Sequence, residues 1–238
     1  MATLKYRRVL LKLSGTVFAG SDGFGIDPAA VQRIARVIGE IQRLGVQVAI
    51  VNGAGNLFRY RQVKDTAMRR VYADAVGMMG TMMNSLSLKD FLEQMKIPVS
   101  LFSAAELQSV IPPYDIRRAQ DDLAAGKVVL ISGGTGHPFF TTDTAAVLRA
   151  LETGADAVLK ATDVDGVYDA DPRRNKKATK YDTVTYTEVR AKNLKVMDQT
   201  AFALAQEHAL PILVFNFSRA GSLRAAVTGK KIGTLVRV

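Results

Sequence analysis

The strongest constraint on the fold is the alternation of short apolar runs with longer amphipathic segments along the whole chain. Residues 6–13, 46–51 and 127–131 are apolar at nearly every position, as strands buried on both faces of a parallel sheet are. The segments between such runs carry apolar residues at the three- and four-residue spacing of helices. Strands that alternate with helices predict a mostly parallel sheet covered on both faces, so the expected fold class is α/β, as a three-layer αβα sandwich.

The clearest helix is the one expected after Asp27. Asp27 is a preferred N-cap residue, and Pro28 suits the first helical position. Apolar residues recur at helical spacing as far as Ile41, and Gly45 stands where a left-handed residue ends a helix. We therefore expect a helix between Pro28 and Gly45.

The remaining elements follow from the same signals. Helices are expected at 66–94, 115–126, 143–153, 187–208 with a break near Asn193, and 223–227. Strands are expected at 99–102, 157–160, 212–217 and 234–238. All of these elements are assigned to a single domain that spans residues 1–238.

Two segments have a less obvious role. Met78, Met79, Met82 and Met83 share one side of an expected helix, which favours packing in the core or between subunits over a ligand role. Residues 163–186 form a long excursion rich in charge, and a loop of that length usually carries function or a small hairpin.

Composition narrows the function. The chain has 32 basic and 22 acidic residues, a net charge of +10, which favours nucleotides, phosphorylated metabolites, nucleic acid or membrane headgroups as partners. The absence of cysteine excludes thiolate zinc sites, cysteine nucleophiles and disulfides, and fits a reducing cytoplasm. No apolar stretch approaches the roughly 20 residues that span a bilayer, and residues 1–20 lack the apolar core of a signal peptide. We expect a cytoplasmic protein without a membrane partner.

Three strand ends fall on glycine-containing turns, at residues 12–15, 52–56 and 133–136. Glycine lets backbone N–H groups converge on an anion, and a following helix adds a positive dipole. The standard alternatives fail, because the sequence lacks a Walker loop, a complete dinucleotide fingerprint, a calcium loop and a nucleophile elbow. The remaining interpretation is that the glycine turns bind phosphate without any of these standard motifs.

Phosphoryl transfer requires positive charge around the moving group and Mg²⁺ on the nucleotide oxygens. Lys12 ends the first strand, and Arg59 follows the second turn, where its guanidinium can bind a phosphate bidentately. Asp143 begins a helix and is a candidate to orient these cations or to help hold magnesium. The structural alternatives are a plain N-cap for Asp143 and a surface position for Lys12. Lys160 is a further candidate at the end of a later strand.

The combination of motifs is found in one known family. The stretches that carry the resemblance are 11–15, 20–25, 55–59, 134–143, 160–162, 164–168, 170–172 and 195–198. Together and in this order they resemble the bacterial-type uridylate (UMP) kinases of the amino acid kinase superfamily, over essentially the whole chain. The resemblance implies the amino acid kinase fold and direct transfer of the γ-phosphoryl group of ATP to UMP.

The resemblance also implies roles for single residues. Lys12, Arg59, Asp143 and Lys160 would be catalytic. ATP would be bound by Lys12, Leu13, Ser14, Gly15, Gly55, Arg59, Thr162, Tyr168 and Asp171. UMP would be bound by Ala54, Asp74, Thr135, Gly136, His137, Pro138, Phe139, Phe140, Thr141 and Thr142. Activation by GTP would involve Gly20, Ser21, Asp22, Gly23, Phe24 and Gly25.

Further implications concern the cofactor and assembly. Mg²⁺ would be carried mainly by ATP rather than by protein ligands, UTP would inhibit, and the chain would form a homohexamer. Four positions depart from the family pattern: Thr16, Ala54, Ala73 and His137. They bear on UMP affinity and regulation more than on the reaction. Two alternatives stay open, namely another kinase of the superfamily, acting on carbamate, acetylglutamate or aspartate, and a nucleic-acid-binding regulator that uses the positive charge.

Overall fold

A computed structural model describes residues 3–59, 66–107, 109–170, 172, 174–194 and 197–238. The described strands form one eight-stranded sheet in the order β3-β4-β2-β1-β5-β7-β8-β6. Their bounds are β1 Arg8–Leu13, β2 Gln47–Asn52, β3 Val99–Ser103, β4 Val128–Ser132, β5 Ala157–Thr162, β6 Thr183–Thr185, β7 Ile212–Asn216 and β8 Thr234–Arg237. The six neighbouring strands β3, β4, β2, β1, β5 and β7 are parallel to one another. Strand β8 is antiparallel to β7, and β6 is parallel to β8. The prediction of a mostly parallel sheet is confirmed.

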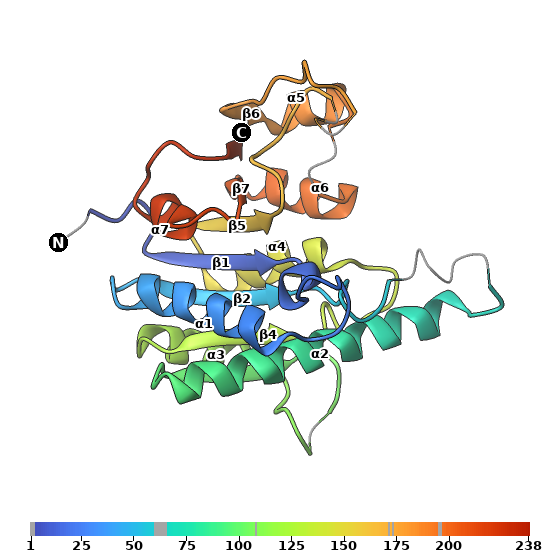
Figure 1. Ribbon diagram of the computed structural model, residues 1–238, viewed down its shortest axis with the longest axis vertical. Helices are drawn as coiled ribbons and strands as arrows, with labels where there is room; N and C mark the ends of the chain where they lie inside the picture. Colours follow the sequence, from blue (N-terminus) through green and yellow to red (C-terminus); the bar gives the residue numbers. More distant parts are fainter. Residues whose placement is uncertain (1–2, 60–65, 108, 171, 173, 195–196) are drawn as a thin grey trace.

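Helices cover both faces of the sheet (Figure 1). Their bounds are η1 Gly15–Phe18, α1 Pro28–Gln42, α2 Arg70–Gln94, α3 Ile116–Ala124, α4 Thr142–Thr153, α5 Tyr186–Ala191, α6 Gln199–Glu207 and α7 Ser222–Val227. One core cluster joins the sheet to α1, α2 and α7, and a second joins it to α3, α4, α5 and α6. The expected three-layer sandwich is therefore confirmed.

Helix α1 forms where the sequence signals place it. The Asp27 carboxylate accepts hydrogen bonds from the backbone N–H groups of Ala29 (3.1 Å) and Ala30 (3.3 Å), two donors that the helix itself leaves unpaired. Gly45 has φ +88°, the left-handed conformation that glycine adopts without strain. Local capping chemistry thus fixes both ends of this helix.

Helix α4 differs from its prediction in one detail that matters for the site. The helix begins at Thr142, and Thr141 is the N-cap, with its hydroxyl accepting from the N–H of Asp143 at 3.0 Å. Asp143 is therefore not the N-cap, and its carboxylate is available for other partners. The alternative interpretation, that Asp143 is only the N-cap of this helix, is wrong.

The C-terminal third also follows the sequence only in outline. The segment expected as one broken helix is two separate helices, α5 and α6, and Asn193 at the expected break has φ +48°. Within the excursion at 163–186, Tyr168 forms an antiparallel bridge with Lys180, and the N–H of Tyr181 donates to the carbonyl of Val167 at 2.9 Å. A small hairpin therefore precedes β6.

The methionines of α2 do not share a buried face. Met82 is 4% exposed, whereas Met79 and Met83 are 60% and 52% exposed. Core packing therefore accounts for Met82, and packing between subunits stays a prediction for the exposed pair. Within the described residues no helix has the length and apolar character to cross a bilayer.

The topology decides where a ligand can bind. Strand β1 lies between β2 and β5, so the chain leaves the first strand toward one side of the sheet and later returns to its other side. Parallel sheets bind ligands beyond the carboxyl ends of strands at such a switch point. The arrows of β1, β2 and β5 point to the same edge in Figure 1, so their terminal turns meet there.

Candidate functional site

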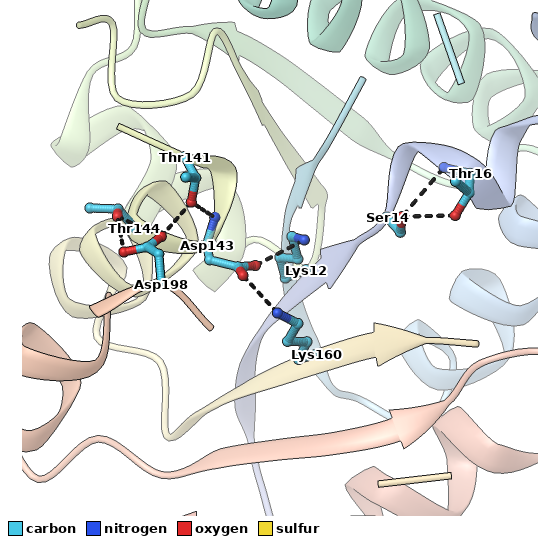
Figure 2. A network of polar contacts seen from close by, with 8 residues as sticks. All are labelled: Lys12, Ser14, Thr16, Thr141, Asp143, Thr144, Lys160 and Asp198. Atoms are coloured by element: carbon cyan, nitrogen blue, oxygen red, sulfur yellow. Dashed lines mark hydrogen bonds and ion pairs between the residues drawn. The ribbon is translucent and has the colours of Figure 1, made fainter. Parts of the chain in front are cut away.

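Two lysines stand side by side at this edge. Lys12 of β1 is the register partner of Lys160 of β5, and register partners in neighbouring strands point to the same face. Both ammonium groups reach the Asp143 carboxylate at the start of α4, Lys12 Nζ to Oδ1 at 2.9 Å and Lys160 Nζ to Oδ2 at 2.7 Å (Figure 2). The three side chains are only 11–16% exposed. The structure thus joins three residues that the sequence places on separate elements.

The charges in this cluster perturb one another. Burial by itself would raise the pKa of the Asp143 carboxyl, but the two neighbouring ammonium groups outweigh burial and hold that pKa below its ordinary value. Burial, assisted by the like charge of Lys12, lowers the pKa of Lys160 despite its contact with Asp143. With two lysines and one aspartate, the cluster carries an excess positive charge in a poorly solvated place, which suits a phosphate.

A second aspartate holds the start of α4. Asp198 accepts a hydrogen bond from the hydroxyl of Thr144 at 3.0 Å and one from the hydroxyl of Thr141 (Figure 2). It is also the N-cap of α6, accepting from the N–H of Ala201 at 2.9 Å. No role was predicted for Asp198, although an aspartate just before a helical segment is a capping signal. Its link to Thr141 becomes visible only in the fold.

The turns after β1 and β2 are in contact. An added side chain at Gly15 would collide with the backbone nitrogen of Gly55, so this approach requires glycine. The N–H of Gly53 donates to the carbonyl of Leu13 at 2.9 Å. The exposed guanidinium of Arg59 lies beside the second turn, with Nε donating to the carbonyl of Gly55 at 2.7 Å. The Ser14 hydroxyl accepts a long hydrogen bond from the backbone N–H of Thr16 (3.4 Å) and forms a second one with the Thr16 hydroxyl at 2.8 Å (Figure 2).

A cavity of about 250 Å³ lies between α2 and the loop before α4. It brings together several residues predicted to bind UMP: Ala54, Asp74, His137, Phe140, Thr141 and Thr142. The other predicted residues of this set, Thr135, Gly136, Pro138 and Phe139, belong to the same loop but are outside its lining. The cavity also contains residues that the sequence did not predict: Phe58, Arg70, Ala73, Gly77, Met78, Thr81 and Gly134.

Asp74 connects α2 to this loop. Its carboxylate accepts from Arg70 Nε at 2.8 and 2.7 Å and from the N–H of Phe139 at 2.7 Å. Phe139 has φ +72°, a conformation that is strained for a residue with a side chain. Phe140, which lines the cavity, is 48% exposed, and the neighbouring Phe139 is 64% exposed, so this side of the cavity is open to solvent. Arg70 was missed, although its i,i+4 spacing from Asp74 was a usable signal.

A larger cavity, of about 650 Å³, opens beside Asp143. Its lining comes mainly from α5, α6 and the segment between them, with Leu194, Met197 and Phe202 among its residues. Thr162 and Tyr168, which were predicted to bind ATP, are not part of this lining; Thr162 Oγ1 instead bonds the backbone of Val164. Asp171, a further predicted ATP residue, lies outside the described residues.

The predicted effector segment is tied to the turn after β2. The N–H of Gly25 donates to the carbonyl of Asn56 at 3.0 Å, and Asn56 Nδ2 donates back to the carbonyl of Gly25 at 2.7 Å. Phe24 beside it is 72% exposed. Two hydrogen bonds between Gly25 and Asn56 therefore connect residues 20–25 to the turn after β2.

The cluster does not suit a metal ion held by protein. Both oxygens of Asp143 face ammonium groups, and Mg²⁺ prefers carboxylate and other oxygen ligands. In the described part of the chain, no group of three histidine, aspartate or glutamate side chains is placed to bind a metal. Among the described residues we therefore assign none to Mg²⁺.

Comparison with known proteins agrees with this fold and shows the family of the chain. The model of the amino acid kinase family matches residues 7–216, and the chain belongs to this family. A uridylate kinase of Aeromonas salmonicida (strain A449) is 52% identical over 231 residues, which are 97% of this chain and 95% of the relative. One of Legionella pneumophila (strain Paris) is 48% identical over 233 residues, 98% of this chain and 94% of the relative.

The solved structures point the same way. A UMP kinase from Bacillus anthracis is similar with a TM-score of 0.94 and 40% identity, and the match covers 98% of this chain and 96% of that one. Within the amino acid kinase family, the chain is thus one of the uridylate kinases, and it is a nucleoside monophosphate kinase. The resemblance inferred from the sequence motifs is confirmed.

Proposed function

We propose that this kinase transfers the γ-phosphoryl group of ATP directly to the phosphate of UMP, giving ADP and UDP. The observation that carries the proposal is the buried cluster of Lys12, Lys160 and Asp143 at the strand ends, next to the cavity that contains Asp74. The cluster supplies positive charge where two phosphate groups would meet. The cavity supplies hydrogen-bond acceptors and apolar walls, and its volume suits a nucleoside.

The chemistry asks little of a general base. The attacking oxygen belongs to a phosphate that is already anionic near neutral pH, so no side chain has to remove a proton. The main obstacle is repulsion between donor and acceptor phosphates, and fixed positive charge lowers that barrier most where it is preorganised and poorly solvated. In this proposal Lys12 and Lys160 contact the transferring group, and Asp143 keeps both ammonium groups in place.

The acceptor nucleoside would be held by the smaller cavity. Asp74 has two carboxylate oxygens and can accept hydrogen bonds from ribose hydroxyls while Arg70 keeps it oriented. Phe140 offers an apolar wall, and Thr141 and Thr142 offer hydroxyl groups. Ala54 adds a methyl group to this cavity where the family pattern has glycine.

The donor side would use the turn at residues 12–15, with Gly55 and Arg59 on the phosphates. Thr162, Tyr168 and Asp171 are proposed for the nucleoside end of ATP, and the cavity beside Asp143 is the larger space available to it. Mg²⁺ would reach the site on the phosphate oxygens of ATP.

We extend the proposal to regulation and assembly on the same family grounds. GTP would activate through residues 20–25, UTP would inhibit, and the chain would form a homohexamer in the cytoplasm. The exposed methionines of α2 are compatible with a subunit contact.

A coupled ADP-release assay with MgATP tests the reaction. UMP, CMP, dUMP, carbamate, acetylglutamate and aspartate are compared as acceptors, with and without GTP. We expect turnover with UMP well above all others. Turnover with a different acceptor would move the chain to another activity of the family. Silence toward every acceptor, together with salt-sensitive binding of nucleic acid that survives Lys12→Met, would favour a binding protein instead.

A further inference from the structure

Part of the buried side of α2 is polar, at positions where a helix usually buries apolar groups. Thr81, Asn84 and Ser85 are 2%, 0% and 0% exposed, and their i, i+3 and i+4 spacing places them on one face. A buried polar group destabilises the fold unless it forms hydrogen bonds. The partners of these three residues therefore explain why they are there.

Asn84 and Ser85 bond the turn that follows β2. Asn84 Nδ2 donates to the carbonyl of Gly53 at 2.9 Å, and the amides of Asn84 and Asn56 exchange two hydrogen bonds of 2.8 and 2.9 Å. Ser85 donates to Oδ1 of Asn52 at 2.5 Å, and Asn52 Nδ2 donates to the carbonyl of Thr81 at 3.0 Å. The turn after β2, which we call the donor-side turn because Gly55 is proposed to bind the phosphates of ATP, is thus fixed to α2 at several points.

Thr81 bonds the turn that follows β4. Its hydroxyl accepts from the N–H of Gly133 at 2.8 Å and donates to the carbonyl of Met78 at 2.6 Å. Gly133 has φ +75°, and a side chain there would come within 2.6 Å of the backbone nitrogen of Ala105. The turn is closely packed, and it leads directly into the loop that lines the acceptor cavity. Thr81 itself also lines that cavity.

We propose that the polar face of α2 is a positioning element that sets the spacing between the donor-side and acceptor-side turns, with Thr81 as the residue that places the acceptor loop. Two turns from different strands are held by residues one helical turn apart on a single rigid helix. Transfer needs reacting atoms about 3–3.5 Å apart, and a displacement of roughly 1 Å can reduce the rate about 100-fold. This inference rests on the proposed function, since it names what positions the same two substrates.

The test uses a pair of variants at position 81. Thr81→Val keeps the shape but removes the acceptor for Gly133 N–H, whereas Thr81→Ser keeps the hydroxyl. We expect Thr81→Val to raise the KM for UMP about tenfold, the value of one buried hydrogen bond, with the KM for ATP changed less than about twofold. Thr81→Ser should stay close to the parent enzyme in both constants.

A matched control separates positioning from general loss of stability. Thr153 is a fully buried threonine whose hydroxyl donates to the carbonyl of Arg149 within α4, and Thr153→Val removes a similar bond away from the turns. If Thr81→Val changed the KM for UMP no more than Thr153→Val does, the proposal would be wrong. Impairment of Thr81→Ser equal to that of Thr81→Val would overturn it as well.

A second measurement needs no substrate. Hydrogen exchange at the amide of Gly133 should become faster in Thr81→Val than in Thr81→Ser and the parent enzyme. If the parent enzyme did not phosphorylate UMP, the proposed function would fail while this measurement still tested the turn. Unchanged exchange at Gly133 would show that Thr81 does not hold the turn and would contradict the inference.

Discussion

The buried cluster of Lys12, Lys160 and Asp143 and the cavity that contains Asp74 are built from different kinds of structure. Lys12, Lys160 and Asp143 lie near the ends of β1 and β5 and at the start of α4, where the one carboxylate pairs with both ammonium groups and leaves an excess of positive charge. The acceptor cavity depends on a loop in which Phe139 is left-handed and exposed, tied to α2 through Asp74. Regular secondary structure therefore supplies charge, and a tethered loop supplies shape.

This difference predicts that substitutions on the two sides separate kcat from KM. The largest effect is expected for Lys12→Met. Removing one preorganised cation at the transferring group should lower kcat about 100- to 1,000-fold, with the KM for UMP little changed, because Lys12 is not among the residues that line the acceptor cavity. Steady-state kinetics with Lys127→Met as a surface control measures it. An unchanged kcat would remove Lys12 from the chemistry.

A smaller loss of kcat, about 10- to 100-fold, is expected for Asp143→Asn. The neutral amide leaves Lys12 and Lys160 facing each other without a counter-charge, so both would shift from their positions. Steady-state kinetics measures this loss, and a kcat within twofold of the parent value would argue against an orienting role.

The same variant should alter the pH dependence of stability. The pKa of Asp143 lies below its unfolded value of about 3.9, so its stabilising contribution is present above that pH and is lost as the pH falls through the folded pKa. Urea unfolding at several pH values should therefore show the difference between parent and variant shrinking in acid. A difference that grows in acid would contradict the direction of the shift.

On the acceptor side, Asp74→Asn should raise the KM for UMP about tenfold and leave kcat and the KM for ATP within a few-fold. An amide accepts at one atom instead of two, so it cannot hold Arg70, Phe139 N–H and two ribose hydroxyls together. Kinetics with UMP and dUMP measure it, and the preference for UMP should fall. Equal losses for both acceptors would show that Asp74 only shapes the loop.

The smallest effect concerns the methyl group of Ala54. A Cβ added at Gly80 of α2 would lie 2.8 Å from the Cβ of Ala54, so Gly80→Ala should overpack the cavity wall and raise the KM for UMP about threefold. The double variant Ala54→Gly/Gly80→Ala exchanges the two methyl groups and should recover most of the loss. A double variant no better than Gly80→Ala alone would show that the contact is not the cause.

The sequence predicted those features whose signals are local. Asp27 and Pro28 mark the start of α1, and the glycine turns mark strand ends that do meet at one edge. The polar face of α2 was missed because Thr81 and Asn84 break the apolar pattern that identifies a helix face, and their partners lie on other elements. The bond between Thr141 and Asp198 joins separate helices, so only the fold places the two together.

The register of β1 and β5 has a consequence for how the enzyme comes into being. Residues 12 and 160 are synthesised far apart in time, and the cation pair exists only after the fifth strand has joined the first. Until then one edge of β1 is unpaired, and an unpaired strand edge can form hydrogen bonds with strands of other chains and aggregate. A nascent chain that ends before β5 lacks the lysine pair, so this pair forms only in the second half of synthesis, when β5 joins β1 and offers its other edge to β7.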